Sequence, residues 1–208
     1  MKNKLIILFL LTTSALHAQQ FRGEITAGIA GSQVSGDQLG GFNKAGVIGG
    51  IGVRITLNEH FEAGFRMLYF QKGSRQRLKN DGTDTSYYLL RLNYIEIPFT
   101  IRYHATKNIY IEAGPSLGRL VSSREEDANG ELTFRQPFYN YDLSITGSLG
   151  YSLTKRLDFT FGYWQSVLPV REHSSNAVYL LNRGQYNSAI TFSFLYTFRK
   201  VAETEKDK

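Results

Sequence analysis

Three histidines follow the first eighteen residues and could act as a general base: His60, His104 and His173. A hydrolase or an acyltransferase needs such a base within hydrogen-bond reach of a nucleophile or a water molecule. His173, followed by Ser174 and Ser175, falls where we expect a long loop, whereas the other two fall in short turns. A lone His-Ser-Ser in a loop is more often solvated polar surface. We therefore favour a protein that is no enzyme and keep a lipid- or peptide-modifying enzyme as an alternative.

Oxygen-bearing side chains alternate at Glu125, Asp127 and Asn129, just before Gly130. This spacing is similar to that of a calcium loop, in which alternate oxygens surround the ion and the glycine makes the turn. The twelfth position is Gln136, however, where such a loop needs a bidentate glutamate. We therefore interpret the segment as an acidic turn, and expect neither a metal nor a cofactor.

Four basic residues follow one another earlier in the chain, at Lys72, Arg75, Arg77 and Lys79. Basic clusters near a membrane surface attract anionic head groups by about 1 kcal/mol per residue. We expect Arg75, Arg77 and Lys79 to contact the phosphates of lipopolysaccharide. The alternative is a charged loop without a ligand.

The elements that would position these side chains show most clearly in the segment 92–103, where apolar and polar residues alternate. Successive side chains of a strand point to opposite faces, so Ile95 and Phe99 share one face while Glu96 and Arg102 share the other. Eight segments show this alternation: 21–31, 46–57, 61–73, 92–103, 108–120, 138–154, 157–168 and 185–198.

The connections between these segments indicate what kind of sheet they form. Short connections at 58–59, 104–107 and 154–156 alternate with long ones at 32–45, 74–86, 122–137 and 169–184. Short turns at one end and long loops at the other are typical of outer-membrane barrels, and a soluble barrel has no need for this asymmetry. The pattern predicts an all-β fold: an eight-stranded antiparallel transmembrane β-barrel in the cell outer membrane, with short periplasmic turns and long extracellular loops.

Polar residues face the lumen of such a barrel and apolar residues face lipid. An eight-stranded interior is only wide enough for side chains to fill, so inward charges should interlock and close the lumen. Without partners, charges in a dry interior would each cost several kcal/mol. The predicted lumen charge network consists of Glu24, Arg54, Glu62, Arg66, Glu96, Arg102, Glu112, Asp142 and Asp158.

Aromatic residues gather toward the ends of the predicted strands. Such residues form girdles where a barrel meets the two membrane interfaces. We assign to these girdles Phe61, Tyr69, Tyr94, Tyr103, Tyr151, Tyr163, Tyr196 and Phe198.

The first residues have the parts of a secretory signal peptide, with Lys2 and Lys4 before a short apolar run and Ala18 at the expected cut. Removal of residues 1–18 lowers the formal net charge from +6 to +4, too mild a charge to favour nucleic acid. The chain has no cysteine, so no disulfide can hold the fold. We expect three parts: a signal peptide at 1–18, the barrel at 19–198 and a polar tail at 199–208.

Three motifs resemble the PorT-like outer-membrane β-barrel family of the porin-like superfamily: 65–73 (FRMLYFQKG), 92–98 (LNYIEIP) and 113–118 (AGPSLG). The likeness covers nearly the whole mature chain and implies an eight-stranded outer-membrane barrel. It also implies a link to protein export by the type IX secretion system, which is the role of PorT itself. Barrels of the outer membrane usually end on an aromatic residue, whereas this chain continues past Phe198.

Three functions remain open from the sequence. The first is a side-chain-plugged, non-enzymatic barrel that engages partners through its loops or rim: outer-membrane lipid, lipopolysaccharide, and envelope or secretion-machinery proteins. The second is the membrane enzyme with His173 as its base, and the third is a narrow channel for small solutes.

Overall fold

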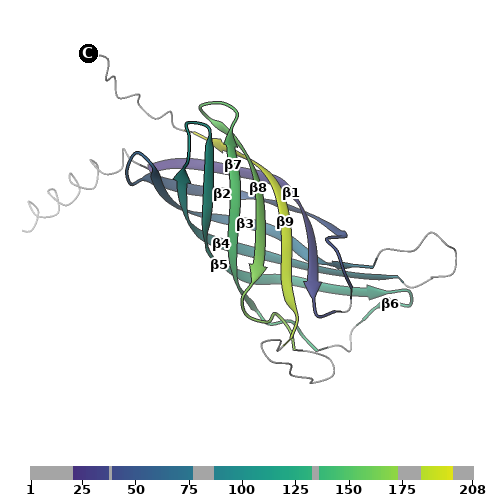
Figure 1. Cartoon of the computed structure of the whole chain (residues 1–208). Coiled ribbons are helices and arrows are strands. Elements are labelled where there is room, and N and C mark those ends of the chain that lie inside the picture. The colour runs from purple at the N-terminus through teal and green to yellow at the C-terminus, as the bar shows by residue number, and fades with distance from the viewer. Residues whose placement is uncertain (1–20, 38, 77–86, 133–135, 173–183, 199–208) are drawn as a thin grey trace, which may run out of the picture.

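A computed structural model describes residues 21–37, 39–76, 87–132, 136–172 and 184–198. It shows a closed antiparallel barrel of eight long strands and confirms the predicted fold (Figure 1). A ninth strand, β6, is a two-residue arm that pairs with the end of β5. The strands are β1 (Phe21–Ser35), β2 (Lys44–Thr56), β3 (Phe61–Arg75), β4 (Tyr88–His104), β5 (Ile109–Asp127), β6 (Gly130–Glu131), β7 (Tyr141–Ser152), β8 (Leu157–Ser166) and β9 (Tyr186–Thr197).

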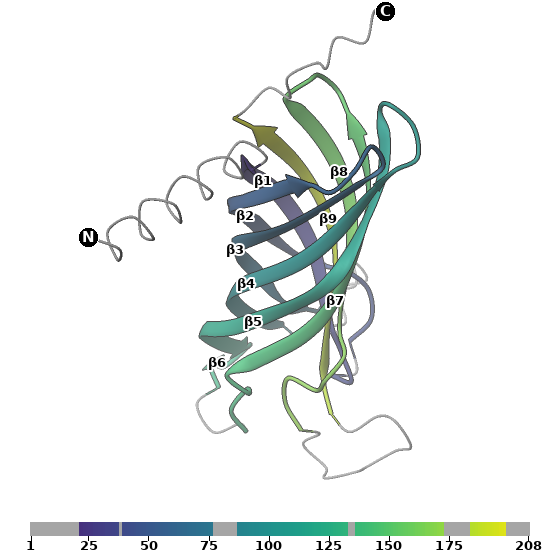
Figure 2. The same ribbon diagram turned by 90° about the vertical axis from the view of Figure 1, so that its left-hand side faces the viewer.

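The barrel closes because β1 pairs with both β2 and β9. Ile25 lies opposite Ile51 on one side and opposite Tyr196 on the other. Closure leaves no unpaired strand edge in the wall. A β-sheet in a membrane needs this closure, because hydrocarbon cannot form hydrogen bonds with unpaired backbone groups. Figure 2 shows the strands running at a tilt to the barrel axis, as closure of a small barrel requires.

The alternation predicted from the sequence sorts the side chains as expected. On β4, Phe99 is 56% exposed on the outer surface, while Glu96 is fully buried. The same division holds on neighbouring strands, where Phe65 and Ile111 face outward. Isoleucine and phenylalanine rows therefore cover the outside of the barrel, and the charged groups lie within.

Three strands extend by four residues or more beyond the predicted bounds at the long-loop end. β1 continues to Ser35, β4 begins at Tyr88, and β5 continues to Asp127. The ladder between β4 and β5 persists up to the pair of Tyr88 and Asp127. Outside the bilayer, strands can go on pairing, but no lipid requires apolar and polar residues to alternate there. The alternation in the sequence therefore could not mark where β1, β4 and β5 end.

The sequence assignment of Tyr94 to an aromatic girdle is wrong. Tyr94 has no exposed surface, and its hydroxyl accepts a hydrogen bond from the side-chain amide of Asn187 at 3.3 Å. A shift in the pairing register lies between Asn93 and Tyr94. Tyr94 has the same inward parity as Glu96, so its ring fills the lumen.

Among the described residues, no helix has the length and apolar character needed to cross a bilayer. The predicted signal peptide at 1–18 and the polar tail at 199–208 lie outside the described residues.

Candidate functional site

Glu112 is the centre of a charged layer at the short-turn end of the lumen. Its carboxylate lies 2.9 Å from Nη2 of Arg54 and 3.0 Å from Nη2 of Arg102, and it also binds Arg66. All four side chains are buried. Three guanidinium groups around one carboxylate would repel one another, so further acids are needed to balance the layer.

Three further acids supply that balance. Glu24 accepts hydrogen bonds from Nε and Nη2 of Arg54, each at 3.2 Å, and Glu62 pairs with Arg22. Asp158 lies 3.2 Å from Nη1 of Arg102. Four arginines thus face four carboxylates in what we call the arginine layer, defined as Arg22, Glu24, Arg54, Glu62, Arg66, Arg102, Glu112 and Asp158.

The ring of Tyr110 stacks against Arg102 of the arginine layer. The guanidinium carbon of Arg102 is 3.7 Å from the centre of the Tyr110 ring, and the Tyr110 hydroxyl donates a hydrogen bond to Asp158 at 3.2 Å. Only glycine fits at position 150, because a side-chain carbon there would lie 2.0 Å from that ring. Gly150 therefore makes room for the ring that holds Arg102.

Lys72 forms a second, separate charged group further along the lumen. Its ammonium donates hydrogen bonds to Glu96 at 2.6 Å and to Asp142 at 3.0 Å. It also lies between 5.1 and 5.8 Å from the ring centres of Phe70, Tyr94 and Trp164. A cation over aromatic faces gains electrostatic attraction, and more so away from water.

Neutral donors complete the coordination of the two carboxylates around Lys72. Ser116 donates to Glu96 at 2.7 Å, Ser166 donates to Asp142 at 2.7 Å, and the amide of Asn187 donates to Asp142 at 2.9 Å. Each acid therefore has a charged and an uncharged donor. We call Lys72, Glu96 and Asp142 the lysine layer.

Apolar side chains separate the two layers along the strands. Leu68 and Phe70 lie between Arg66 and Lys72 on β3, and Trp164 packs edge-on to Phe70 at 5.3 Å. Within the described part of the chain, no ion pair joins the arginine layer to the lysine layer. The structure thus brings all nine predicted network residues into the lumen, but in two groups where the sequence suggested one.

The extracellular end of the lumen is closed by apolar residues. We define the apolar cap as the buried cluster Val34, Leu90, Leu92 and Tyr94, against which Tyr88, Leu120 and Phe138 pack. These residues come from β1, the extended ends of β4 and β5, and the segment that precedes β7. Apolar side chains at this end disfavour the entry of water and ions between them.

A buried ion pair lies over the apolar cap. Nη1 of Arg171 is 2.7 Å from Glu125, and its Nε donates to the side chain of Gln185 at 2.9 Å. Its guanidinium stacks 4.1 Å from the centre of the Phe138 ring, and Tyr88 donates to Glu125 at 2.6 Å. Sequence reasoning missed this pairing because its partners lie in segments that appeared to be loops.

The acidic segment considered as a calcium loop is a β-hairpin in the structure. Glu125 is committed to Arg171, and Asp127 accepts a hydrogen bond from the backbone of Asn129 within the turn at 2.7 Å. Among the residues described, no group of three acids, histidines or cysteines is placed to hold a metal ion.

Tyr139, in the segment that precedes β7, donates a hydrogen bond to Glu172. This hydrogen bond raises the pKa of the Tyr139 phenol.

The predicted lipopolysaccharide contacts are only partly within the described residues. Arg75 is exposed at the end of β3, whereas Arg77 and Lys79 lie outside the described part. Lys72, the first of the four basic residues in chain order, is buried in the lumen. It lies six residues after Arg66 on β3, so the two side chains share the inward face.

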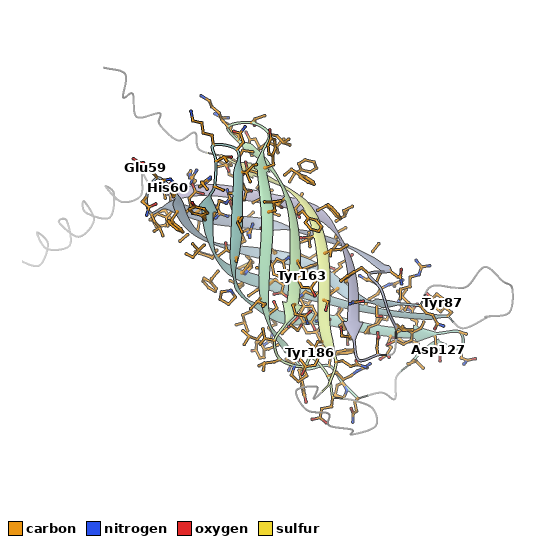
Figure 3. The ribbon with its side chains drawn as sticks, in the orientation of Figure 1. Glu59, His60, Tyr87, Asp127, Tyr163 and Tyr186 are labelled. Atoms are coloured by element: carbon orange, nitrogen blue, oxygen red, sulfur yellow. The ribbon has the colours of Figure 1, made fainter. Side chains whose placement is uncertain are left out.

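The described histidines lie at the short-turn end, away from the long loops. His60 stacks on Tyr103 with ring centres 6.2 Å apart, and Nε2 of His104 is 3.4 Å from Glu62. Figure 3 shows Glu59 and His60 at one end of the barrel, with Tyr87 and Asp127 at the opposite end. His173, the candidate base, lies outside the described residues.

The lumen contains different amounts of open space along its length. A cavity of about 470 Å³ opens at the short-turn end, among the arginine layer and the turns. Between the layers there is a pocket of only about 20 Å³, lined by Thr26, Thr146 and Thr191 among others. That pocket has room for about one water molecule. Buried side chains therefore occupy most of the described interior between the two layers.

An apolar exterior around a closed eight-stranded lumen defines an integral barrel protein of the outer membrane. Residues 17–170 match the family model described as outer membrane protein beta-barrel domain, and the chain belongs to this family. The protein is accordingly located in the outer membrane.

Solved structures show the same architecture at low sequence identity. Ail, the attachment invasion locus protein of Yersinia pestis, aligns with a TM-score of 0.52 and 12% identity, covering 86% of this chain and 99% of Ail. Its complex with the heparin analogue sucrose octasulfate aligns with a TM-score of 0.51, 12% identity and the same coverage. Neisserial surface protein A aligns with a TM-score of 0.47 and 15% identity, and the alignment covers 85% of this chain and 97% of that protein. The sequence matches no curated protein. At this identity, the likeness to Ail shows the fold alone.

Proposed function

We propose that this barrel is a non-enzymatic surface protein that binds lipopolysaccharide and envelope partners through its extracellular strand extensions. The observation that carries the proposal is the filled lumen, with its apolar cap below the buried Arg171–Glu125 pair. A barrel filled in this way offers surfaces rather than a passage. Its working parts are then the rim and the outer wall.

The outer wall at the extracellular end supports binding to phosphate groups. Arg91 on β4 lies directly opposite Arg124 on β5, and Arg119 on β5 lies opposite Ile95, four residues further along β4. All three arginines are exposed, as is Arg75 on β3. Tyr141, whose hydroxyl accepts a hydrogen bond from Arg119 at 2.7 Å, belongs to the adjacent aromatic belt. Guanidinium groups just above such a belt lie at the height of lipopolysaccharide phosphates, which they bind in bidentate fashion.

Lipopolysaccharide binding is tested by a triple variant, Arg75→Ser with Arg91→Ser and Arg124→Ser. We expect the purified variant to retain much less lipopolysaccharide than the wild type, because three of its phosphate-binding groups are gone. The matched control is Lys107→Ser with Lys155→Ser and Arg156→Ser, which removes three positive charges at the periplasmic end. Equal retention by the triple variant and the control would contradict the proposal.

A narrow channel is the alternative that the filled lumen disfavours. We expect planar bilayers containing the wild-type protein to show no steady conductance, since the lysine layer and the apolar cap block the path in series. A variant with Leu90→Ala, Leu92→Ala and Lys72→Ala should conduct if this seal is the barrier. Steady conductance by the wild type would favour a channel instead.

The resemblance to PorT-like barrels extends this proposal to protein export by a type IX secretion system. Under this proposal the rim or the loops contact components of the machinery. Cross-linking in intact cells followed by mass spectrometry provides the test. Recurrent cross-links to secretion proteins would support the export role, and cross-links to lipopolysaccharide alone would contradict it.

A further inference from the structure

The outer wall of the barrel has an apolar hollow near its short-turn end. The hollow has a volume of about 370 Å³, and its lining comes from β1, β2, β3 and β4. Among the lining residues that the structure describes, only Thr100 has a polar side chain, and Thr100 is itself buried. None of the functions considered above uses this surface.

The hollow exists because a small residue, Ala63, stands among large ones. Ala63 faces outward on β3 and lies opposite Ile55 of β2 and Ile101 of β4. Phe61 and Phe65, its outward neighbours along β3, are 40% and 48% exposed. One methyl group among four large side chains leaves a space that none of them fills. We call this hollow the Ala63 recess.

Aromatic pairs hold the walls of the Ala63 recess in place. The ring centres of Phe65 and Phe99 are 5.9 Å apart, and those of Phe61 and Tyr103 are 5.1 Å apart. Both pairs lie directly across the ladder between β3 and β4. The recess therefore has its shape before a ligand arrives, which lowers the cost of binding.

The shape of the recess favours a flexible hydrocarbon chain. Lipid tails are as apolar as the side chains that face them, so burial from water does not drive binding within a bilayer. A chain that enters a recess, however, gains dispersion contacts on several sides, whereas a chain against a convex wall gains them on one. A bound acyl chain is thus distinguished from bulk lipid by its packing.

A polar hollow adjoins the recess at the turn between β2 and β3. It is lined by Asn58, Glu59, His60, Phe61 and Tyr103. The Asn58 side chain accepts hydrogen bonds from the backbone of His60 and Phe61, each at 2.9 Å, and the His60 ring stacks on Tyr103. Glu59 is exposed and makes no ion pair with any residue that the structure describes (Figure 3). Its carboxylate attracts a cationic head group and repels an anionic one.

We propose that the Ala63 recess and the turn at Glu59 together bind one phospholipid of the periplasmic leaflet, whose head group carries an amine. An acyl chain occupies the recess, the amine pairs with Glu59, and the imidazole of His60 donates a hydrogen bond to the phosphate. A second copy of the chain fits this face less well. Two recesses facing each other leave a void, and two-fold packing brings the two Glu59 carboxylates together.

The test is native mass spectrometry of the full chain, released from bilayer nanodiscs that contain equal amounts of phosphatidylethanolamine and phosphatidylglycerol. We expect one phosphatidylethanolamine molecule to stay bound to each barrel, in several-fold preference to phosphatidylglycerol. Equal retention of the two lipids, or retention of neither, would overturn the proposal. Pairs of barrels that stay together without lipid would also overturn it, because the recess would then be a contact between copies.

Filling the recess separates a specific site from general contact with lipid. Ala63→Leu should reduce the retention of phosphatidylethanolamine about tenfold, since the added side chain takes the place of the acyl chain. The matched control is Ala27→Leu, which makes the same change on the outer face of β1 but does not line the recess. We expect the control to retain lipid like the wild type. An equal loss in both variants would overturn the proposal.

A change at the turn tests the recognition of the head group. Glu59→Gln should lower the preference for phosphatidylethanolamine over phosphatidylglycerol about threefold, because the amide cannot pair with the charged amine. Glu131→Gln, which removes an exposed acid at the opposite end of the barrel, is the control. An unchanged preference in Glu59→Gln, or the same decrease in the control, would overturn the proposal.

Discussion

The two ends of the lumen are closed by different chemistry. At the periplasmic end, charged pairs such as Arg22 with Glu62 and Arg102 with Asp158 line a cavity of about 470 Å³. At the extracellular end, Leu90 and Leu92 are fully buried in the apolar cap, near the Arg171–Glu125 pair. Charged groups tolerate water in their neighbourhood, whereas an apolar cluster excludes it. In the described part of the chain, charged groups beside open space thus line one end of the lumen, and packed apolar groups lie at the other.

The largest effect should come from Glu112→Gln. The neutral side chain leaves three buried guanidinium groups around one position without their shared acid, and breaking buried pairs in this way typically costs about 3–5 kcal/mol. Urea unfolding in lipid vesicles, followed by the fluorescence of Trp164, measures the loss. The control Glu131→Gln removes an exposed charge on β6 and should leave stability unchanged. Unchanged stability in Glu112→Gln would show that the arginine layer does not hold the periplasmic end together.

Leu92→Ala should have a smaller effect, of about 2–4 kcal/mol, because it opens a hole in the apolar cap. The same unfolding experiment measures it. Leu117→Ala is the matched control, since Leu117 faces lipid and its removal leaves no internal cavity. Equal losses in the two variants would mean that the cap is packed no better than the lipid-facing surface.

Thiol accessibility tests the asymmetry directly, and the absence of natural cysteines makes single-cysteine variants clean reporters. Ser152→Cys places a thiol on the wall of the periplasmic cavity, whereas Leu90→Cys places one in the apolar cap. With a charged, membrane-impermeant reagent acting on open membrane fragments, we expect Ser152→Cys to react at least about tenfold faster, because ionised reagents do not enter an apolar cluster. Similar rates would show that water reaches both ends of the lumen.

The smallest effect should come from Arg124→Gln. Arg124 pairs with Glu126 at 2.7 Å and with Glu131 at 3.6 Å, but it is largely exposed. Exposed ion pairs contribute little, so the free energy of unfolding should change by less than about 0.5 kcal/mol. Urea unfolding again provides the measurement. A loss comparable to that of Glu112→Gln would mean that the outer wall, and not the lumen, carries the stability of the barrel.

The inward position of the charges could be predicted from their spacing. Glu62 and Arg66 on β3, and Glu96 and Arg102 on β4, alternate with apolar residues at a period of two. Their division into two layers could not be predicted. Which charges form pairs depends on the register between neighbouring strands and on the stagger of the strands around the barrel. Neither can be predicted from the sequence of one strand.

The periodic pattern of this chain by itself determined the eight strands, the apolar exterior and the polar lumen. These follow from local geometry, since a strand in lipid must present apolar side chains on one face and satisfy its backbone with its neighbours. Only the tertiary structure decided that Tyr94 meets Asn187, that Lys72 is separated from the arginines, and that Arg171 covers Glu125. Those contacts join residues far apart in the chain, and their partners are set by the closure of the barrel.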